Sequence, residues 1–314
     1  MRILITGING FVGRHLAEHL SASGRHQVIG LTRKTAGAPL ADVSLVHADL
    51  LDPAQTRSAL ADAAPDTIFH LAAQANVPQS FADPAGTLQT NMQSQLNLFE
   101  AVRALGADPL VLVAVSNEIY GPPSTLPVDE DAPLRPVNPY AVSKATQDLL
   151  AYQYFAAYHM RTIRLRPFNH IGPRQSDKYV TGAFAAQIAR IEAGLQEPLM
   201  RVGNLSAERD FTDVRDIVRA YELAALHGEA GAAYNIGSDR AVSIQHILDR
   251  FLAHSRVSIR VEPDPARMRP TDVPRVVCDS RRFRSLTGWE PQIPLEQTLI
   301  DILDVWREVR QENL

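Results

Sequence analysis

The sequence predicts an α/β protein built around a doubly wound parallel sheet, and two observations support this prediction. Short apolar or β-branched runs alternate with longer helical stretches through the first 170 residues, which is the rhythm of repeated strand-helix-strand units. Several of these runs are apolar at every position, and residues 111–115 are the clearest case. Strands of this kind are covered by helices on both faces, as in a parallel sheet.

The expected strands of the sheet lie in the first 170 residues. They are residues 2–6, 27–32, 44–48, 67–72, 110–115 and 162–166. Between the first two, Val12, Leu16 and Leu20 recur every four residues and give the first helix one apolar face. This face is expected to pack on the sheet.

After about residue 170 the rhythm changes. Helices are expected at residues 181–194, 213–227, 243–253 and 295–310, with short extended pieces at 198–203 and 232–236. We therefore expect a first domain of residues 1–168, completed by parts of 210–240. Residues 169–314 mainly form a smaller C-terminal α/β lobe that binds the substrate.

Composition excludes several classes of protein. The 314 residues carry 31 Lys and Arg against 35 Asp and Glu, a net charge of −4, which argues against a nucleic-acid binder. No run approaches the roughly 20 apolar residues that span a bilayer. A lone cysteine, Cys278, cannot form an intrachain disulfide, and Met1 leads directly into a strand without a signal peptide. We expect a cytoplasmic protein with a small-molecule partner.

A glycine-rich loop follows the first strand. Its sequence is Thr6-Gly7-Ile8-Asn9-Gly10-Phe11-Val12-Gly13, and the first helix begins inside it. Gly7 permits a tight turn, Gly10 lets the backbone approach a pyrophosphate, and Gly13 lets the helix pack closely on the strand. Glycines at this spacing could form only a turn, but their position after the first strand predicts a Rossmann-type dinucleotide site.

The end of the second strand indicates which dinucleotide is bound. An acidic residue there would favour NADH, whereas this strand ends in Thr32 and Arg33. A hydroxyl and a guanidinium suit a 2′-phosphate, so we expect NADPH, with NADH still acceptable. The alternative is that Arg33 is a solvated loop charge.

Three residues suggest carbonyl chemistry. Tyr140 and Lys144 lie four apart at an expected helix start, so they share one face of the helix. A nearby ammonium makes a tyrosine more useful as an acid or base near neutral pH. Ser116 follows the buried strand 110–115, at the edge where parallel sheets place ligands, and its hydroxyl can bind a carbonyl oxygen.

These motifs together resemble the extended short-chain dehydrogenase/reductase family, which contains sugar-nucleotide epimerases, dehydratases and reductases. The resemblance also rests on His70-Leu71-Ala72-Ala73, Asn91 and Tyr120-Gly121, and spans essentially the whole chain. It implies catalysis by Ser116, Tyr140 and Lys144. It further implies cofactor contacts from Gly7, Asn9, Gly10, Phe11, Val12, Gly13, Thr32, Arg33, Asp49, Leu50, Leu71, Ala72, Ala73, Tyr140, Lys144 and Pro167.

Four later segments resemble one branch of this family. They are residues 166–173, 202–205, 209–216 and 266–270. This branch reduces GDP-4-keto-6-deoxy-D-mannose to GDP-D-rhamnose. The implied substrate contacts are Ser116, Asn117, Glu118, Asn169, Val202, Arg209 and Arg269. Without the resemblance, Arg209 could equally be an ion-pair partner of Asp210 or Asp213, and Arg269 a loop charge.

Glu118 keeps alternatives open. It stands where sugar-nucleotide 4,6-dehydratases carry a general base, so a GDP-mannose 4,6-dehydratase is the second hypothesis. A 4-epimerase is a weaker alternative. A Rossmann module that senses the dinucleotide without turnover is an alternative of a different class. The sequence leaves open the guanine base and the choice between D-rhamnose and 6-deoxy-talose as product.

Two further expectations concern metals and assembly. His15 and His19 reproduce a zinc-peptidase spacing, but their helix opens from the glycine loop and turns other residues to the sheet, so we expect no metal site. The resemblance implies a homodimer through a four-helix bundle of residues 87–104 and 139–158. Its apolar candidates are Leu88, Leu96, Leu149, Leu150, Tyr154 and Phe155.

Overall fold

The computed structural model describes residues 1–33, 40, 42–267 and 273–311. Its centre is a parallel sheet of seven strands, which confirms the predicted fold class. The order is β10 (Ala233–Ile236), β6 (Thr162–Pro167), β5 (Leu110–Ala114), β4 (Thr67–His70), β1 (Arg2–Thr6), β2 (Gln27–Thr32) and β3 (Val43–His47).

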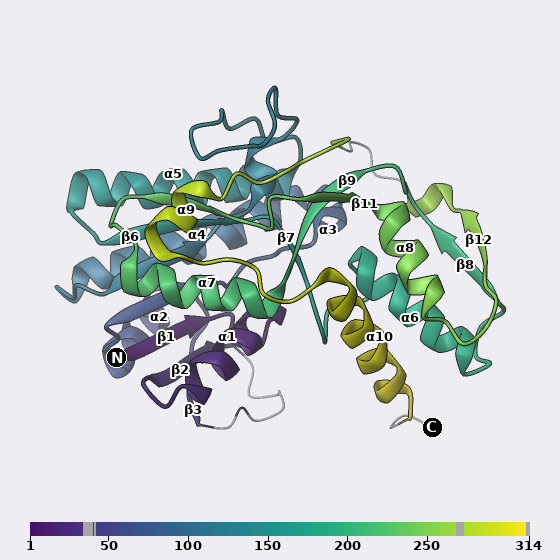
Figure 1. Cartoon of the computed structure of the whole chain (residues 1–314). Coiled ribbons are helices and arrows are strands. Elements are labelled where there is room, and N and C mark those ends of the chain that lie inside the picture. The colour runs from purple at the N-terminus through teal and green to yellow at the C-terminus, as the bar shows by residue number, and fades with distance from the viewer. Residues whose placement is uncertain (34–39, 41, 268–272, 312–314) are drawn as a thin grey trace.

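Helices cover both faces of this sheet, because its strands turn alternate apolar side chains to opposite sides (Figure 1). One face packs on α2 (Pro53–Ala63), α4 (Pro84–Ala104) and α5 (Pro139–Tyr158). The other packs on α1 (Phe11–Ala22), α7 (Val214–His227) and α9 (Arg281–Thr287). As predicted, Leu16 and Leu20 of α1 are fully buried.

Strands β1 and β4 lie side by side, and the chain winds outward from them in both directions. This is the switch point at which doubly wound sheets bind ligands, beyond the carboxyl ends of the strands. Strand β4 ends at His70, two residues earlier than expected. The chain turns there because Leu71 and Ala72 donate their backbone N–H groups to Thr6 Oγ1, each at 3.2 Å.

A second body of structure lies beside the carboxyl edge of the sheet (Figure 1). Its own core joins α6 (Val180–Glu192), α8 (Ile244–Ala253) and α10 (Leu295–Gln311). Strand β8 (Leu199–Val202) pairs in parallel with β12 (Arg260–Pro263). A three-stranded sheet joins β7 (Asn169–Ile171), β9 (Glu208–Asp213) and β11 (Ala241–Ser243).

Three short helices complete the described chain. They are α3 (Val77–Ala82), the 3₁₀ turn η1 (Asn117–Tyr120) and the 3₁₀ turn η2 (Pro265–Arg267). Among the described residues, every helix is too short or too polar to cross a membrane.

Candidate functional site

The glycine loop between β1 and α1 is shaped by close backbone contacts. Gly7 has a positive φ of 72°, and a Cβ added to it would lie 2.9 Å from the backbone nitrogen of Ala72. A Cβ on Gly13 would overlap the carbonyl oxygen of Gly7. The loop therefore accepts only glycine at these positions, and it brings bare backbone and the first turn of α1 to the switch point.

The expected adenosine end of the site lies where β2 and β3 finish. The Asn9 side chain donates from Nδ2 to Thr32 Oγ1 at 2.9 Å, so the glycine loop and the end of β2 are joined. Arg33 is exposed, and its guanidinium lies 3.9 Å from the Asp49 carboxylate. Leu50 is buried, and its carbonyl accepts a hydrogen bond from Asn97.

Ser116 and Tyr140 come together although they belong to different elements. Ser116 follows β5 and begins η1, where its Oγ accepts the backbone N–H of Glu118 at 3.2 Å. Tyr140 lies in the first turn of α5 and forms a side-chain hydrogen bond with Ser116. Burial raises the pKa of Tyr140, the bond to Ser116 lowers it, and Glu118 and Tyr179 raise it further. The phenol therefore stays protonated at neutral pH.

Lys144 lies one turn further along α5 and is only 4% exposed. Its Nζ donates to the carbonyl oxygen of Ala114 at 2.7 Å, which ties α5 to the end of β5. Burial lowers the pKa of Lys144 from 10.5 to about 7. Burial also lowers the pKa of His70 to about 3, with help from the Lys144 charge. This imidazole is therefore neutral beside the ammonium.

Buried amide side chains hold α5 against α4 around this point. Asn91 donates from Nδ2 to Ser143 Oγ at 2.8 Å and to the Gln74 carbonyl at 3.0 Å. Gln147 donates to the backbone carbonyl of Asn91 at 2.8 Å. These contacts fix the turn of α5 between Tyr140 and Lys144.

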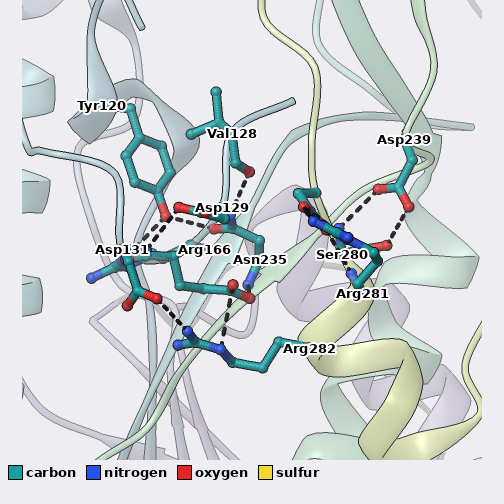
Figure 2. Close-up of polar contacts among 12 residues, drawn as sticks. Tyr120, Val128, Asp129, Asp131, Arg166, Asn235, Asp239, Ser280, Arg281 and Arg282 are labelled. Atoms are coloured by element: carbon teal, nitrogen blue, oxygen red, sulfur yellow. Dashed lines mark hydrogen bonds and ion pairs between the residues drawn. The ribbon is translucent and has the colours of Figure 1, made fainter. Parts of the chain in front are cut away.

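A second buried network holds α5 from the far side. Asp148 accepts two hydrogen bonds from Arg166, at 2.8 and 2.9 Å. Figure 2 shows Arg166 and Asn235 meeting at the hydroxyl of Tyr120, with distances of 2.9 and 2.7 Å. Strands β6 and β10 and the middle of α5 are thus joined by this network.

Glu118 and Asn117 lie in η1, next to Ser116. The Glu118 carboxylate accepts a hydrogen bond from Asn138 Nδ2 at 3.0 Å, and Asn117 is buried. The other expected cofactor contacts surround the same edge of the sheet. Phe11 and Val12 begin α1, Ala73 follows the turn after β4, and Pro167 is the buried end of β6.

The second body contains three of the expected substrate contacts, Asn169, Val202 and Arg209. Asn169 begins β7, and its Oδ1 is buried without a hydrogen-bond partner among the described residues. Arg209 lies on β9, nearly buried, and donates to the carbonyl of Glu208 at 2.9 Å. Val202 is 2% exposed, with its side chain in the core of this body. Arg269 lies outside the described residues.

The two carboxylates next to Arg209 have other partners. Asp210 accepts hydrogen bonds from the Ser238 side chain at 2.6 Å and from the backbone N–H of Cys278 at 3.0 Å. Asp213 pairs with Arg215 at 2.7 Å. From the sequence alone, an ion pair of Arg209 with Asp210 or Asp213 was an alternative. In the structure, these two carboxylates instead make the contacts just described, which hold β9 in place.

Sequence reasoning missed two residues near Tyr140. Asn138 precedes the Tyr-x-x-x-Lys motif and caps α5, and an Asn-Pro pair before a helical run is a usable signal for such a cap. Tyr179 precedes α6, and its effect on the pKa of Tyr140 places it close by. No local pattern marks Tyr179, because its position depends on how the second body packs.

The metal-like spacing in α1 does not bring the two histidines to one point. His15 Nε2 lies 3.0 Å from the Pro173 carbonyl, and His19 Nε2 lies 2.7 Å from Glu222. Within the described chain, one group of potential ligand atoms lies within 4.8 Å, namely Asp210, Asp239 and Cys278. The Asp210 and Asp239 carboxylates hold backbone and serine groups there, and Cys278 is buried.

Comparison with known proteins gives consistent relatives. The family model described as GDP-mannose 4,6 dehydratase matches residues 4–302. The GDP-6-deoxy-D-mannose reductase of Pseudomonas aeruginosa is 39% identical over 99% of both chains. The UDP-glucose 4-epimerase of Mycolicibacterium smegmatis is 31% identical, covering 99% of this chain and 100% of that one.

Solved structures agree with the sequence relatives. The structure of RMD from Pseudomonas aeruginosa complexed with NADPH superimposes with a TM-score of 0.86. It is 35% identical, and the match covers 98% of this chain and 100% of that one. The family match over residues 4–302 and the reductase relative show that the chain belongs to the GDP-mannose 4,6-dehydratase family of Rossmann-type sugar-nucleotide enzymes.

Proposed function

We propose that this protein reduces GDP-4-keto-6-deoxy-D-mannose to GDP-D-rhamnose with NADPH. The observation that carries the proposal is the meeting of Ser116, Tyr140 and Lys144 at the carboxyl end of β5. The reductase relative, at 39% identity over nearly the whole chain, supports the choice of a GDP-sugar. We assign residues 1–168, with parts of 210–240, to the cofactor, and most of 169–314 to the sugar nucleotide.

The glycine loop fits a dinucleotide. The bare backbone around Gly7 and Gly13, at the start of α1, leaves room for a pyrophosphate where side chains would block it. Thr32 ends β2 and accepts a hydrogen bond from Asn9, and we propose that Thr32 and the adjacent Arg33 hold the 2′-phosphate. NADPH is therefore the proposed cofactor, and NADH, which lacks this phosphate, the weaker substitute.

When bound, the cofactor supplies the hydride for the ketone carbon, and the side chains bind and protonate the carbonyl oxygen. Tyr140 donates its phenolic proton to the carbonyl oxygen as the alkoxide develops, and its raised pKa keeps that proton available. Ser116 hydrogen-bonds the same oxygen and orients it. Lys144, anchored on Ala114, supplies positive charge below the phenol and a donor for the nicotinamide ribose.

The GDP part is proposed to act as a handle. Asn169 carries a buried carboxamide oxygen without a described partner, which suits a ligand donor. Arg209 and Arg269 are proposed to bind phosphate or ribose, because a guanidinium gives permanent, paired donors. Asn117 and the backbone of Val202 complete the proposed contacts. Binding energy from this remote part then orients the reacting sugar.

One reaction tests the proposal. The enzyme is incubated with GDP-4-keto-6-deoxy-D-mannose and NADPH, absorbance at 340 nm is followed, and the product is identified by NMR. We expect one NADPH consumed per sugar and the D-rhamnose configuration. A 6-deoxy-talose product would correct the stereochemistry, and the same test with UDP- or dTDP-keto sugars checks the guanine base.

A second candidate function rests on Glu118. Its carboxylate is close enough to Tyr140 to raise the pKa of the phenol, which also suits a base beside a transient ketone. GDP-mannose 4,6-dehydratase activity would then convert GDP-mannose to a keto sugar with no net change in the nucleotide cofactor. A sensing module without turnover would instead bind NADPH tightly and consume none with any keto sugar.

We also propose a homodimer through α4 and α5. Leu88, Met92 and Leu96 form a stripe along α4 at intervals of four, and Val142 and Leu149 lie seven apart on α5. Leu149 is 58% exposed and Met92 is exposed as well, whereas Tyr154 is buried inside the chain. Partly exposed apolar stripes on two packed helices suit a four-helix bundle. Light scattering at the monomer mass of 34.5 kDa would refute it.

A cytoplasmic location is proposed on chemical grounds. The reaction consumes NADPH, and the single cysteine is free and buried. Cell fractionation of a tagged chain tests this location.

A further inference from the structure

A chain of hydrogen bonds joins the turn after β4 to the backbone of Tyr140. The Gln74 N–H donates to Asn91 Oδ1 at 2.7 Å, and Asn91 Nδ2 donates to the Gln74 carbonyl at 3.0 Å. Asn91 Nδ2 also donates to Ser143 Oγ at 2.8 Å, and Ser143 Oγ donates to the Tyr140 carbonyl at 2.7 Å. Asn91 and Ser143 are fully buried, so the middle of the chain is shielded from water.

The Gln74 backbone fixes the direction of every bond in this chain. A peptide N–H can only donate and a carbonyl can only accept, so the Asn91 carboxamide can face Gln74 in one orientation alone. Its remaining amide hydrogen then points to Ser143, whose oxygen has to accept it. The single hydroxyl hydrogen of Ser143 is left for the Tyr140 carbonyl. Each polar group of the chain therefore has one defined role.

The two ends of the chain are segments that have to meet in the proposed reaction. Gln74 directly follows residues 71–73, which we expect to contact the cofactor. Tyr140 lies in the first turn of α5 and is the proposed proton donor. The hydride and the proton go to the two atoms of one carbonyl group, so a small error in the distance between these segments slows the reaction strongly.

Other contacts of α5 hold the helix without joining these two ends. Gln147 donates to the Asn91 backbone carbonyl at 2.8 Å, which keeps α4 and α5 together. Lys144 Nζ ties the helix to the end of β5. Among the described residues of α5, Ser143 is the one whose side chain bonds both to the Tyr140 backbone and to Asn91.

We propose that Ser143 is a positioning residue that sets the Tyr140 phenol against the cofactor turn of residues 71–73. The proposal rests on the proposed reduction, in which Tyr140 protonates the ketone oxygen. A serine within a helix often bonds to a carbonyl one turn earlier, and the second bond, from Asn91, is what distinguishes Ser143. Without the hydroxyl, a buried N–H of Asn91 loses its acceptor, and α5 shifts against α4 to relieve this cost.

Ser143→Ala removes both bonds of the hydroxyl, and alanine preserves the helix. We expect kcat for reduction of the keto sugar to fall about tenfold, and the rate of NADPH oxidation in a single turnover to fall by the same factor. The Kd for NADPH should stay within about twofold of wild type, because residues 71–73 keep their own place. Far-UV circular dichroism confirms that each variant is folded at the assay temperature.

Asn91→Ala interrupts the same chain one step earlier, and its single-turnover rate should fall at least as far as that of Ser143→Ala. The two changes act on one chain, so their effects should not multiply. We expect the double variant to react within about twofold of Asn91→Ala. A double variant slowed by the product of the two single effects would show that Ser143 acts apart from Asn91, and would overturn the proposal.

Ser80→Ala is the matched control. Ser80 is also fully buried, lies in α3, and donates from Oγ to the carbonyl of Val77, three residues earlier, at 2.7 Å. It thus has the same helical bond as Ser143 but no part in the chain. Ser80→Ala should keep the wild-type single-turnover rate and Kd for NADPH. The proposal is overturned if Ser143→Ala reacts as fast as Ser80→Ala.

Crystal structures of the wild type, Ser143→Ala and Ser80→Ala give a readout that does not depend on the substrate. After superposition on β1, β4 and β5, we expect Tyr140 in Ser143→Ala to be displaced from residues 71–73 by about 0.5 Å or more, and to be in place in Ser80→Ala. An undisplaced Tyr140 in Ser143→Ala overturns the positioning role. A wild-type enzyme that oxidises no NADPH with the keto sugar overturns the proposed function instead, and the structural comparison then decides the role of Ser143.

Discussion

Lys144→Met should stabilise the protein at neutral and acid pH. The Lys144 ammonium is buried, and burial lowers its pKa from 10.5 to about 7. Between these two values the unfolded chain binds a proton that the folded chain has released. Unfolding is therefore proton-linked in this window, and the stability contributed by Lys144 rises as the pH rises from 7 to 10.5.

The size of the effect follows from the shift in pKa. Each unit corresponds to about 1.4 kcal/mol, so the folded state gains about 5 kcal/mol across the window. At pH 6 the wild type bears the full cost of the buried charge, offset by about 1 kcal/mol from the hydrogen bond to Ala114. Lys144→Met should thus be more stable by about 4 kcal/mol at pH 6, and the difference should nearly vanish by pH 10.5.

Urea unfolding followed by far-UV circular dichroism measures this difference, at fixed protein concentration and without NADPH. The exposed Lys178→Met is the matched control, and its curve should parallel that of the wild type. Parallel curves for Lys144→Met and wild type from pH 6 to 10, or a variant less stable at pH 6, would refute the reasoning.

Three more substitutions address the site and its support. Tyr140→Phe should lower kcat by a factor of about 10² to 10⁴, because the proton donor is lost while the ring still fills its place. A steady-state kcat near that of the wild type would contradict this. Arg33→Ala should raise the KM for NADPH about tenfold or more and leave that for NADH nearly unchanged, and equal effects on both would exclude a 2′-phosphate contact. Asp148→Asn should lower the free energy of unfolding by about 3–5 kcal/mol, since it leaves the buried Arg166 without its carboxylate; an unchanged urea midpoint would show that the pair is not needed.

Local patterns were enough to predict the centre of the fold. The apolar runs correspond to β1, β2, β4, β5 and β6 within two residues, because buried parallel strands carry an uninterrupted apolar signal. The spacing of the glycines also identified the loop from local sequence. Close backbone contacts at Gly7 and Gly13 exclude every larger residue at these two positions.

Contacts between segments far apart in the chain could not be predicted from the sequence. Strands β7 and β11 have three residues each, too few for a periodic signal, and they are defined by their pairing with β9. The bond between Asn138 and Glu118 spans 20 residues and depends on how the intervening loop returns. Likewise, only the packed structure shows the Val202 side chain inside a core.

The most direct test of the central claim is the stoichiometry of NADPH oxidation with GDP-4-keto-6-deoxy-D-mannose, measured at 340 nm with NMR identification of the sugar. The proposed mechanism predicts one NADPH oxidised per molecule of GDP-D-rhamnose formed, and almost none with Tyr140→Phe. Conversion of GDP-mannose to a keto sugar without net NADPH oxidation, together with no reduction of the keto sugar, would contradict the claim and establish the dehydratase instead.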